Sequence, residues 1–366
     1  MNGGVPAQAP PTSGAAPDFA ELQARAETAR DADQTDEAIV LYQKAVELRP
    51  GWGEGWWSLG TLQYERKAFS QSAEAFQKAA ALNPRNGIAR AMLGLSEFEL
   101  GQDASALKHI QEGKELGLPD DPQLQNVVLY HEGVLLRRTG MFQGALQRLH
   151  TLCFGGVQNP DLLQALGMVA LWRNEKVPAG DRDAEVVARV GRAECLAGQK
   201  KFDEARQEYA AVARDYPTYP NIHYAYGWFL LVAEDMPAGY AELEQEIKNN
   251  PRHVMARLQI AATRYKVDSA AGLPYAEEAV KLDPQLVVGH YVLGLLLLDT
   301  DDYLRAIPEL EMVQEAQPEF AKAYLALGAA YARAGREQDA ALARAAFQRL
   351  KQDAGKEPEL LAMPER

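Results

Sequence analysis

The sequence contains only two cysteines, Cys153 and Cys195, among its 366 residues. Neither belongs to a Cys-x-x-Cys pair or to a Cys/His spacing that is typical of structural zinc sites. Free cysteines are among the residues most often buried, so we expect two separate, half-buried thiols in helix cores. Two cysteines are too few to indicate whether the protein folds in a reducing or an oxidising compartment.

Long apolar runs are also missing. The longest candidates, Tyr224–Ala233 and Tyr291–Leu298, are far shorter than the roughly 18 apolar residues that a membrane span needs. Residues 1–18 are rich in Pro, Ala and Gly and have no basic n-region and no apolar h-region, so we expect a flexible leader and no signal peptide. Localisation stays open: cytoplasmic for the chain as given, but periplasmic or secreted if an export signal was removed upstream of the leader.

Positive charge is scarce relative to negative charge. The chain has 38 Lys and Arg against 51 Asp and Glu, a net charge of −13 and a pI of about 5.1. Nucleic acids are bound largely through Lys and Arg that displace counterions from phosphates, so this balance argues against a nucleic-acid partner. Apolar residues make up 47% of the chain, which is enough for a packed core and excludes global disorder.

Sequence motifs of catalysis are absent as well. There is no GxGxxG, no P-loop and no GxSxG elbow. His131-Glu132 begins an HExxH pattern, but Leu135 stands where the second metal-binding histidine would be. His223 and His290 fall at a packing position of the pattern described below, which favours hydrogen-bonded core histidines. We therefore predict no catalytic residue, no metal site and no cofactor, and a protein that is not an enzyme.

What the sequence does have is a regular spacing of prolines. Proline cannot continue a helix, and it biases the residue before it away from helical geometry. A helix stop at every 34 residues or so is typical of stacked helix pairs. Six prolines recur here at intervals of 33 or 34 residues in two runs, which are Pro50 and Pro84, then Pro217, Pro251, Pro284 and Pro318.

Each interval repeats the same pattern of small and bulky residues. Gly or Ala falls at the eighth position and Ala, Ser or Gly at the twentieth, because two helices that cross closely need small side chains there. Clear examples are Trp56-Leu59-Gly60, Leu293-Gly294 with Ala306 and Pro318, and Tyr324-Leu327-Gly328-Tyr331 with Ala340. These motifs resemble the tetratricopeptide repeat. The resemblance implies an all-α, right-handed α-solenoid of about nine to ten helix pairs.

The repeats follow one another with little interruption. The repeat that covers 254–286 is one residue short, and its pattern places Leu273 at the helix crossing. The last repeat has a polar second helix, which we expect to cap the array. The assigned repeats are 19–52, 53–86, 87–120, 126–159, 186–219, 220–253, 254–286, 287–320 and 321–354.

One irregular segment near 151–185 interrupts the array. The small crossing residues Ala106 and Ala145 are 39 residues apart, and Ala205 follows only after 60. The excess predicts one additional amphipathic helix at about Asp161–Asn174 and then a loop at 175–183. We therefore divide the chain into a leader at 1–18, an N-terminal repeat block at 19–159, an irregular helix and loop at 160–185, a C-terminal repeat block with a polar cap at 186–354, and a tail at 355–366.

The candidate functional surface is the face of each first helix that lies opposite its packing face. The resemblance implies that positions 2, 5, 9 and 12 of a repeat line a concave channel in which extended peptides lie. In this chain those positions are often apolar or aromatic. The candidate partner-binding residues are Trp57, Tyr64, Phe98, Tyr130, Arg137, Tyr224, Trp228, Tyr265 and Tyr291.

Three interpretations of this face stay open. A helix that is apolar on both faces is expected to be buried on both, so the array could shield its own inner wall. Alternatively, the wall forms a groove for a partner segment, anchored by Trp57, Tyr130, Tyr224 and Trp228. The third interpretation is self-association through the same surface.

The leading functional hypothesis is a non-enzymatic protein–protein interaction scaffold. It would bind a peptide or protein segment in an apolar, aromatic-lined concave groove. The Lys and Asn positions of the family's carboxylate-clamping variant are not matched, so a chaperone-tail adaptor is not expected. The alternatives are an accessory subunit that recruits substrate or glycan to an enzyme, and a structural homo-oligomer.

Overall fold

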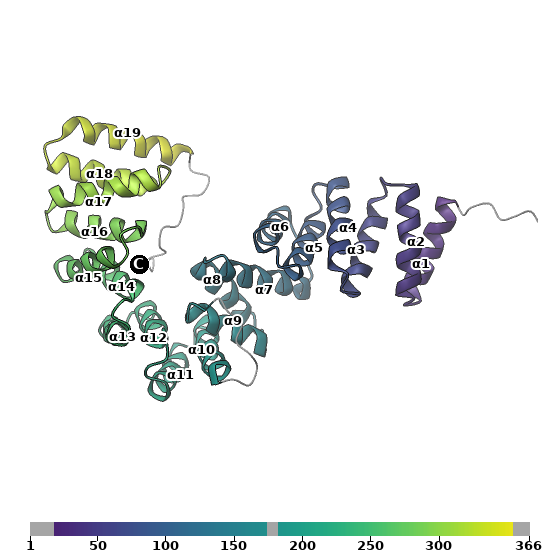
Figure 1. Cartoon of the computed structure of the whole chain (residues 1–366), viewed down its shortest axis with the longest axis horizontal. Helices are drawn as coiled ribbons and strands as arrows, with labels where there is room; N and C mark the ends of the chain where they lie inside the picture. Colours follow the sequence, from purple (N-terminus) through teal and green to yellow (C-terminus); the bar gives the residue numbers. More distant parts are fainter. Residues whose placement is uncertain (1–17, 174–181, 354–366) are drawn as a thin grey trace, which may run out of the picture. The chain divides into compact units, whose positions relative to one another are not determined.

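The computed structural model describes residues 18–173 and 182–353. Over these residues the chain consists of nineteen α-helices and contains no β-strand (Figure 1). The expected tail, nearly all of the expected leader and most of the loop at 175–183 lie outside the described residues. The segment limits drawn from the sequence therefore stay predictions.

The chain forms two compact units, Met1–Arg148 and Leu149–Arg366. The boundary between them falls inside α8, Phe142–Phe154. Unit 1 contains α1 Phe19–Asp31, α2 Thr35–Leu48, α3 Gly53–Glu65, α4 Phe69–Leu82, α5 Gly87–Glu99, α6 Asp103–Leu116 and α7 Pro122–Arg138. Unit 2 contains α9 Pro160–Ala170, α10 Arg182–Gly198, α11 Phe202–Asp215, α12 Ile222–Val232, α13 Met236–Asn249, α14 Val254–Arg264, α15 Ser269–Leu282, α16 Val287–Asp299, α17 Tyr303–Ala316, α18 Ala321–Arg333 and α19 Glu337–Asp353.

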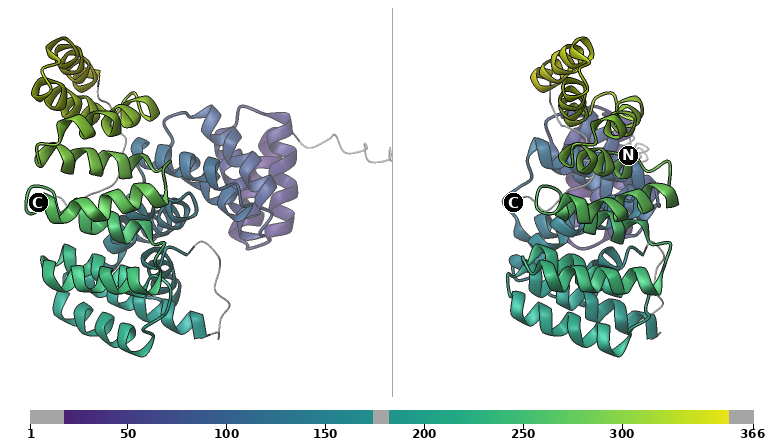
Figure 2. Two further views of the ribbon diagram at one scale, coloured as in Figure 1. Left: turned by 60° about the vertical axis from the view of Figure 1, so that its left-hand side comes forward. Right: turned by 90° about the vertical axis from the view of Figure 1, so that its left-hand side faces the viewer.

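Within each unit, two helices that are joined by a tight turn pack side by side as a pair. Unit 1 has the pairs α1–α2, α3–α4 and α5–α6, and unit 2 has α12–α13, α14–α15, α16–α17 and α18–α19. The second helix of one pair also contacts the first helix of the next, so the pairs stack in chain order, as the green to yellow helices of unit 2 show in Figure 2. This confirms the predicted all-α solenoid.

The two helices of a pair cross closely at the small residues. In the pair α3–α4, the hydroxyl of Ser72 donates a hydrogen bond of 2.9 Å to the carbonyl oxygen of Gly60. A side chain on one helix therefore reaches the backbone of the other. Gly60 and Ser72 occupy the eighth and twentieth positions of their repeat, so the predicted crossing residues do meet here.

The turn inside each pair depends on one residue with a positive φ. At Lys67 the φ is 58°, and the N–H of the next residue, Ala68, donates to the carbonyl of Gln63 at 2.8 Å. This bond closes the last turn of the first helix and reverses the chain direction. The same conformation recurs at Asp33, Lys67, Gly101, Glu234, Lys266, Asp301 and Gly335.

The regularly spaced prolines take part in a second repeated contact. The side chain six residues after the proline donates a hydrogen bond to the proline carbonyl, which satisfies a polar group between two pairs. These donor and acceptor residues are Trp56 and Pro50 at 2.9 Å, His223 and Pro217 at 2.9 Å, His290 and Pro284 at 2.9 Å, and Tyr324 and Pro318 at 3.0 Å. The prediction that His223 and His290 are hydrogen-bonded core histidines is thereby confirmed.

The first helices of unit 2 are buried on nearly all sides. In α12, every residue from Ile222 to Leu231 is buried except the half-buried Trp228. The first helices of successive pairs contact one another directly, as α14 does with α16 and α16 with α18. This burial matches the apolar character of both helix faces. Of the helices described, none has the length and apolar character to cross a membrane.

The irregular segment forms a group of three helices. The additional helix is α9, which ends four residues before the predicted limit at Asn174. Helix α10 packs against both α9 and α11, so it acts as the second helix of one pair and the first helix of the next. Helices α9 and α10 cross so closely that a Cβ on Gly191 would lie 1.7 Å from the carbonyl oxygen of Leu163. Sharing α10 in this way accommodates one odd helix among regular pairs.

The two cysteines form a disulfide, which corrects the expectation of separate, half-buried thiols. The Sγ atoms of Cys153 on α8 and Cys195 on α10 are bonded, and both side chains are fully buried. Beside the bond, Nε2 of His150 lies 2.7 Å from a carboxylate oxygen of Glu194. Helix α9 separates α8 from α10 along the chain, so the repeat pattern gave no sign that the two cysteines would meet.

The short repeat at 254–286 requires a second correction. The structure places Gly272, instead of Leu273, at the crossing of α14 and α15. A Cβ on Gly272 would lie 3.2 Å from the carbonyl oxygen of Ala261, whereas Leu273 is half-buried in the adjoining apolar cluster. The missing residue thus shortens the turn before α15, and the small residue at the crossing is retained.

We predict that Gly191→Ala destabilises the protein by about 2 kcal/mol or more, because the new Cβ would overlap backbone that cannot rotate away. The matched control is Gly144→Ala in α8, where the nearest atom would be 3.6 Å away. That control should be neutral or stabilising by up to about 1 kcal/mol, since Ala favours helices. Urea denaturation measures both free energies of unfolding, and equal losses would contradict the close crossing.

We predict that replacing Cys153 and Cys195 together by Ser lowers the free energy of unfolding by about 2–4 kcal/mol. The physical reason is that the bond restricts the unfolded chain between two positions 42 residues apart. Reducing the wild type should produce a similar loss, and reductant should leave the double-Ser variant unchanged. A wild type whose unfolding is the same in the presence and absence of reductant would refute the disulfide.

Candidate functional site

The nine predicted partner-binding residues all lie on or directly after helices that the repeat pattern assigns as the first helix of a repeat. Seven of them are half-buried, whereas Arg137 and Tyr224 are each only 4% exposed. Trp57 and Tyr64 lie on α3, Phe98 on α5, Tyr130 and Arg137 on α7, Tyr224 and Trp228 on α12, Tyr265 after α14, and Tyr291 on α16. Their binding role stays a prediction.

In unit 1, Phe98 and Tyr130 meet at one histidine. The ring of His131 contacts Phe98 at 4.6 Å and Tyr130 at 5.3 Å between centroids, edge to face in both cases. The guanidinium of Arg138 lies 4.4 Å from the Phe98 ring centroid and is paired with Asp103 at 2.9 Å. Phe98, Tyr130 and His131 thus form one aromatic group, which joins α5 to α7.

Burial shifts the pKa values of the titratable side chains in and around this aromatic group. Burial lowers the pKa of His131, so its ring is uncharged near neutral pH. Burial likewise lowers the pKa of Arg137, and the neighbouring Arg138 lowers it further. Burial raises the pKa of Tyr64, and the negative charge of Glu99 adds to the effect. The group can therefore contribute apolar contact area and hydrogen-bonding groups, with the positive charge of Arg138 at its edge.

Trp57 lines a pocket on the same side of α3 as Tyr64. The pocket has a volume of about 260 Å³ and lies between α3 and the turn that joins α1 to α2. Trp57 is held from within the repeat, because its ring packs against Phe76 at 5.3 Å between centroids. The remaining lining residues are Arg30, Asp33, Thr35, Ser58, Thr61, Leu62 and Glu65.

In unit 2, Tyr224 is part of the protein's own packing. Its ring contacts Trp172 at 5.3 Å and stacks on His253 at 5.0 Å between centroids. Burial raises the pKa of the Tyr224 hydroxyl, which is hydrogen-bonded to Gln259. Trp172 has a φ of 53° in the turn after α9, so this contact connects the irregular segment to the regular pairs.

Asn221 makes several of the polar contacts near Tyr224. It has a φ of 66°, its side-chain amide donates to the carbonyl of Leu171 at 2.8 Å, and its Oδ1 lies 3.0 Å from Nε2 of His253. The buried carboxylate of Glu246 accepts hydrogen bonds from the backbone N–H groups of Asn221 and Tyr224. Burial, together with the charge of the nearby Arg257, lowers the pKa of His253 to about 4.

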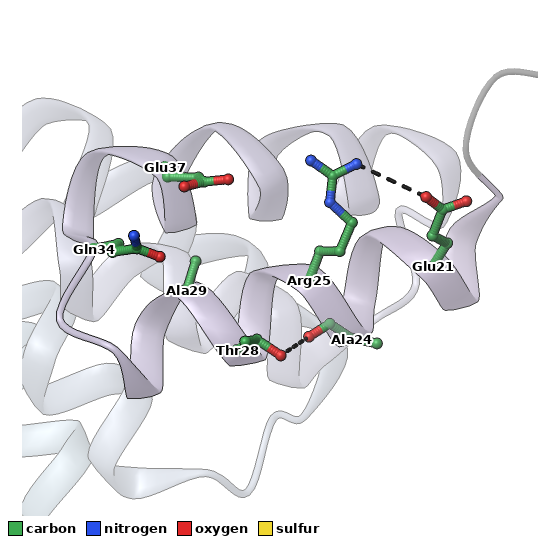
Figure 3. Close-up of a pocket in the computed structure, with 7 residues that line it drawn as sticks. All are labelled: Glu21, Ala24, Arg25, Thr28, Ala29, Gln34 and Glu37. Atoms are coloured by element: carbon green, nitrogen blue, oxygen red, sulfur yellow. Dashed lines mark hydrogen bonds and ion pairs between the residues drawn. The ribbon is translucent and has the colours of Figure 1, made fainter. Parts of the chain in front are cut away.

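A second pocket, of about 300 Å³, lies between α1 and α2 at the first pair (Figure 3). Figure 3 shows Arg25 directed toward Glu21 on the same helix, with the two side chains 3.8 Å apart. Thr28 donates to the carbonyl of Ala24 at 2.8 Å. These contacts are local to α1, and the pocket contains no aromatic side chain.

Sequence reasoning missed several residues of these sites. His131 drew attention only as part of an incomplete metal motif, although it lies one residue after Tyr130. Asp33 and Glu65 fall outside the four positions expected to line the channel. Glu65 lies on the same helix as Trp57, whereas the proximity of Asp33 to Trp57 depends on how two pairs stack. Within the described residues, no group of three or more His, Cys, Asp or Glu is arranged to hold a metal ion.

The fold and these sites define a helical-repeat protein with half-buried aromatic side chains along its first helices. The family model described as tetratricopeptide repeat matches residues 24–81, 69–117, 182–220, 192–253 and 291–356, which together cover more than half of the chain. The chain belongs to the tetratricopeptide repeat family. No curated protein matches it in sequence.

Several solved structures resemble parts of the chain. MamA from Desulfovibrio magneticus RS-1 is 20% identical with a TM-score of 0.44, and the match covers 47% of this chain and 98% of that one. Yeast Tom70 is 15% identical with a TM-score of 0.36, over 92% of this chain and 70% of that one. YrrB, described as a TPR protein with an unusual peptide-binding site, is 18% identical with a TM-score of 0.31, over 59% and 95%. All three TM-scores are below 0.5, so no property of these proteins is transferred to this chain.

We predict that His253 makes the protein less stable as the pH falls from 7 to 4. The unfolded histidine takes up a proton near pH 6.5, whereas the folded one stays neutral until about pH 4. The stability advantage of the wild type over His253→Asn should therefore shrink across this range, as measured by urea denaturation at each pH. An advantage that is constant from pH 7 to pH 4 would contradict the prediction.

His223 provides a control with the opposite sign. Burial lowers its pKa, but the carboxylate of Glu242 and the carbonyl of Pro217 together raise it above the ordinary value. The folded state therefore binds the proton more tightly than the unfolded state does. The advantage of the wild type over His223→Asn should grow as the pH falls through the folded pKa, and should be complete below about pH 6.5.

Proposed function

We propose that this protein is a non-enzymatic scaffold that binds an extended segment of another protein along the exposed side of its first helices. The observation that carries the proposal is the recurrence of half-buried aromatic side chains at equivalent positions, namely Tyr64, Phe98 and Tyr265 at position 12 and Trp57, Tyr130 and Tyr291 at position 5. Half-buried aromatics give a partner a large apolar contact area at a low cost in side-chain entropy.

Two further observations support direct contact in unit 1. Trp57 lines a pocket, and Phe98 and Tyr130 are held in place by His131. Rigid side chains lose little freedom when a partner binds, so this arrangement is suited to recognition. The buried Tyr224 and Arg137 would influence a partner only by positioning their neighbours.

Membership of the tetratricopeptide repeat family also supports a protein or peptide as the partner. Proteins of this family are generally interaction scaffolds without enzymatic activity. The fold alone does not specify a partner, so the argument depends on the surface residues of this chain. Nucleic acid is a poor candidate partner, because the net charge is −13.

We predict that Trp57→Ala combined with Trp228→Ala reduces partner capture by about tenfold or more, because both changes remove apolar area from the exposed side of first helices. The measurement is chemical crosslinking followed by affinity purification from the source cells, with quantification of each captured protein. The matched control is Leu304→Ala with Leu342→Ala, which removes two side chains that are each 70% exposed on second helices.

Circular dichroism must show that both double variants are folded before capture is compared. If the double-Trp variant captures every partner as well as the wild type does, the proposed binding face is wrong. Light scattering at several protein concentrations tests self-association separately. A mass that rises with concentration in the wild type but not in the double-Trp variant would assign this face to a homo-oligomer.

A further inference from the structure

We propose that the Trp57 pocket of unit 1 binds the cationic side chain of a lysine or arginine in the partner segment, an inference that rests on the proposed scaffold function. Four features support this assignment: the lining residues, the distribution of charge, the size of the pocket and its position on the first-helix face.

The pocket contains an aromatic wall next to two carboxylates. Trp57 supplies the ring, while Asp33 comes from the α1–α2 turn and Glu65 from the last residue of α3. A lysine or arginine cation is attracted both to a tryptophan face and to carboxylates, so the two kinds of group favour the same ligand. Ser58 and Thr61 add hydroxyl groups that can accept a hydrogen bond from the cation.

The one positive side chain in the pocket is already neutralised by the protein. The guanidinium of Arg30 donates to the carboxylate of Asp31 at 2.8 and 3.0 Å, and to the hydroxyl of Tyr42 at 3.2 Å. Asp33 and Glu65 have no ion-pair partner among the described residues. The pocket therefore has an excess of negative charge, which matches a cationic ligand and opposes an acidic one.

The size of the pocket and its position on α3 indicate that it binds a single side chain of an extended segment. A volume of about 260 Å³ is below the usual range for sites that enclose a whole small molecule. Trp57 and Thr61 occupy positions 5 and 9 of their repeat, which are the positions expected to line the channel. A segment that lies along the first helices would thus bring one of its side chains to the pocket.

The test uses the full chain labelled with ¹⁵N at tryptophan, and the indole N–H signal of Trp57 is identified with the Trp57→Phe variant. The probes are short capped Ala/Ser peptides with one central lysine, glutamate or norleucine. We expect the lysine peptide to shift the Trp57 signal, with a weaker effect at high salt. Glutamate and norleucine peptides should leave this signal in place.

The variant Glu65→Gln with Asp33→Asn should weaken binding of the lysine peptide roughly fivefold to tenfold, because both carboxylates are removed. Asn tolerates the positive φ of 56° at position 33, so the turn is retained. The matched control is Glu54→Gln, an exposed carboxylate on α3 that does not line the pocket. Its affinity for the lysine peptide should equal that of the wild type.

A glutamate or norleucine peptide that shifts the Trp57 signal as strongly as the lysine peptide would overturn the inference. So would a carboxylate variant that binds the lysine peptide with unchanged affinity, or a lysine peptide that leaves the signal in place. Such results leave the scaffold proposal standing if the double-Trp variant still loses its captured partners. Loss of the scaffold proposal requires the separate result that the double-Trp variant captures every partner.

Discussion

The close crossing of the two helices in each pair governs how each pair packs against its neighbours. Helices approach to within backbone contact only where side chains are small, as the hydrogen bond from Ser72 to the Gly60 carbonyl shows. Gly191, which has no room for a Cβ beside Leu163, is the extreme case. A tight pair exposes its remaining apolar faces to the pairs on either side, so the helices stack into an array and bury most of each first helix.

Polar contacts between and within pairs keep this stack in register. The positive-φ turn closes each first helix, and the side chain six residues after a regularly spaced proline satisfies the proline carbonyl. The donor is Trp in one repeat, His in two and Tyr in another, so the contact depends on an N–H or O–H at one position and tolerates different side chains. His223 is also paired with the carboxylate of Glu242 on the second helix, which raises the pKa of His223 and makes the stability of that repeat depend on pH.

The proposed binding surface consists of the parts of the first helices that remain accessible after the pairs have stacked. First helices with aromatic residues on both faces bury one face in the pair and part of the other against neighbouring first helices. Tyr224 is buried in this way, whereas Trp57 is only half-buried and lines a pocket. The repeat positions predicted Trp57 as a candidate, since they depend only on helical periodicity. They did not predict Asp33, which approaches Trp57 only through the stacking of α3 on the first pair, or Glu65, which lies on α3 outside the expected lining positions.

From the amino-acid sequence alone we could predict the helix pairs, the small residues at most crossings and the place of the irregular segment. These features are local: they depend on residues within one repeat, where proline positions and helical periodicity are directly visible. Three features could not be predicted in this way: the bond between Cys153 and Cys195, the presence of Gly272 in place of Leu273 at a crossing, and the packing of α10 against two neighbours. These features depend on how the helices pack in three dimensions. The repeat pattern of the sequence looks the same whichever helices come into contact, so it does not predict those contacts.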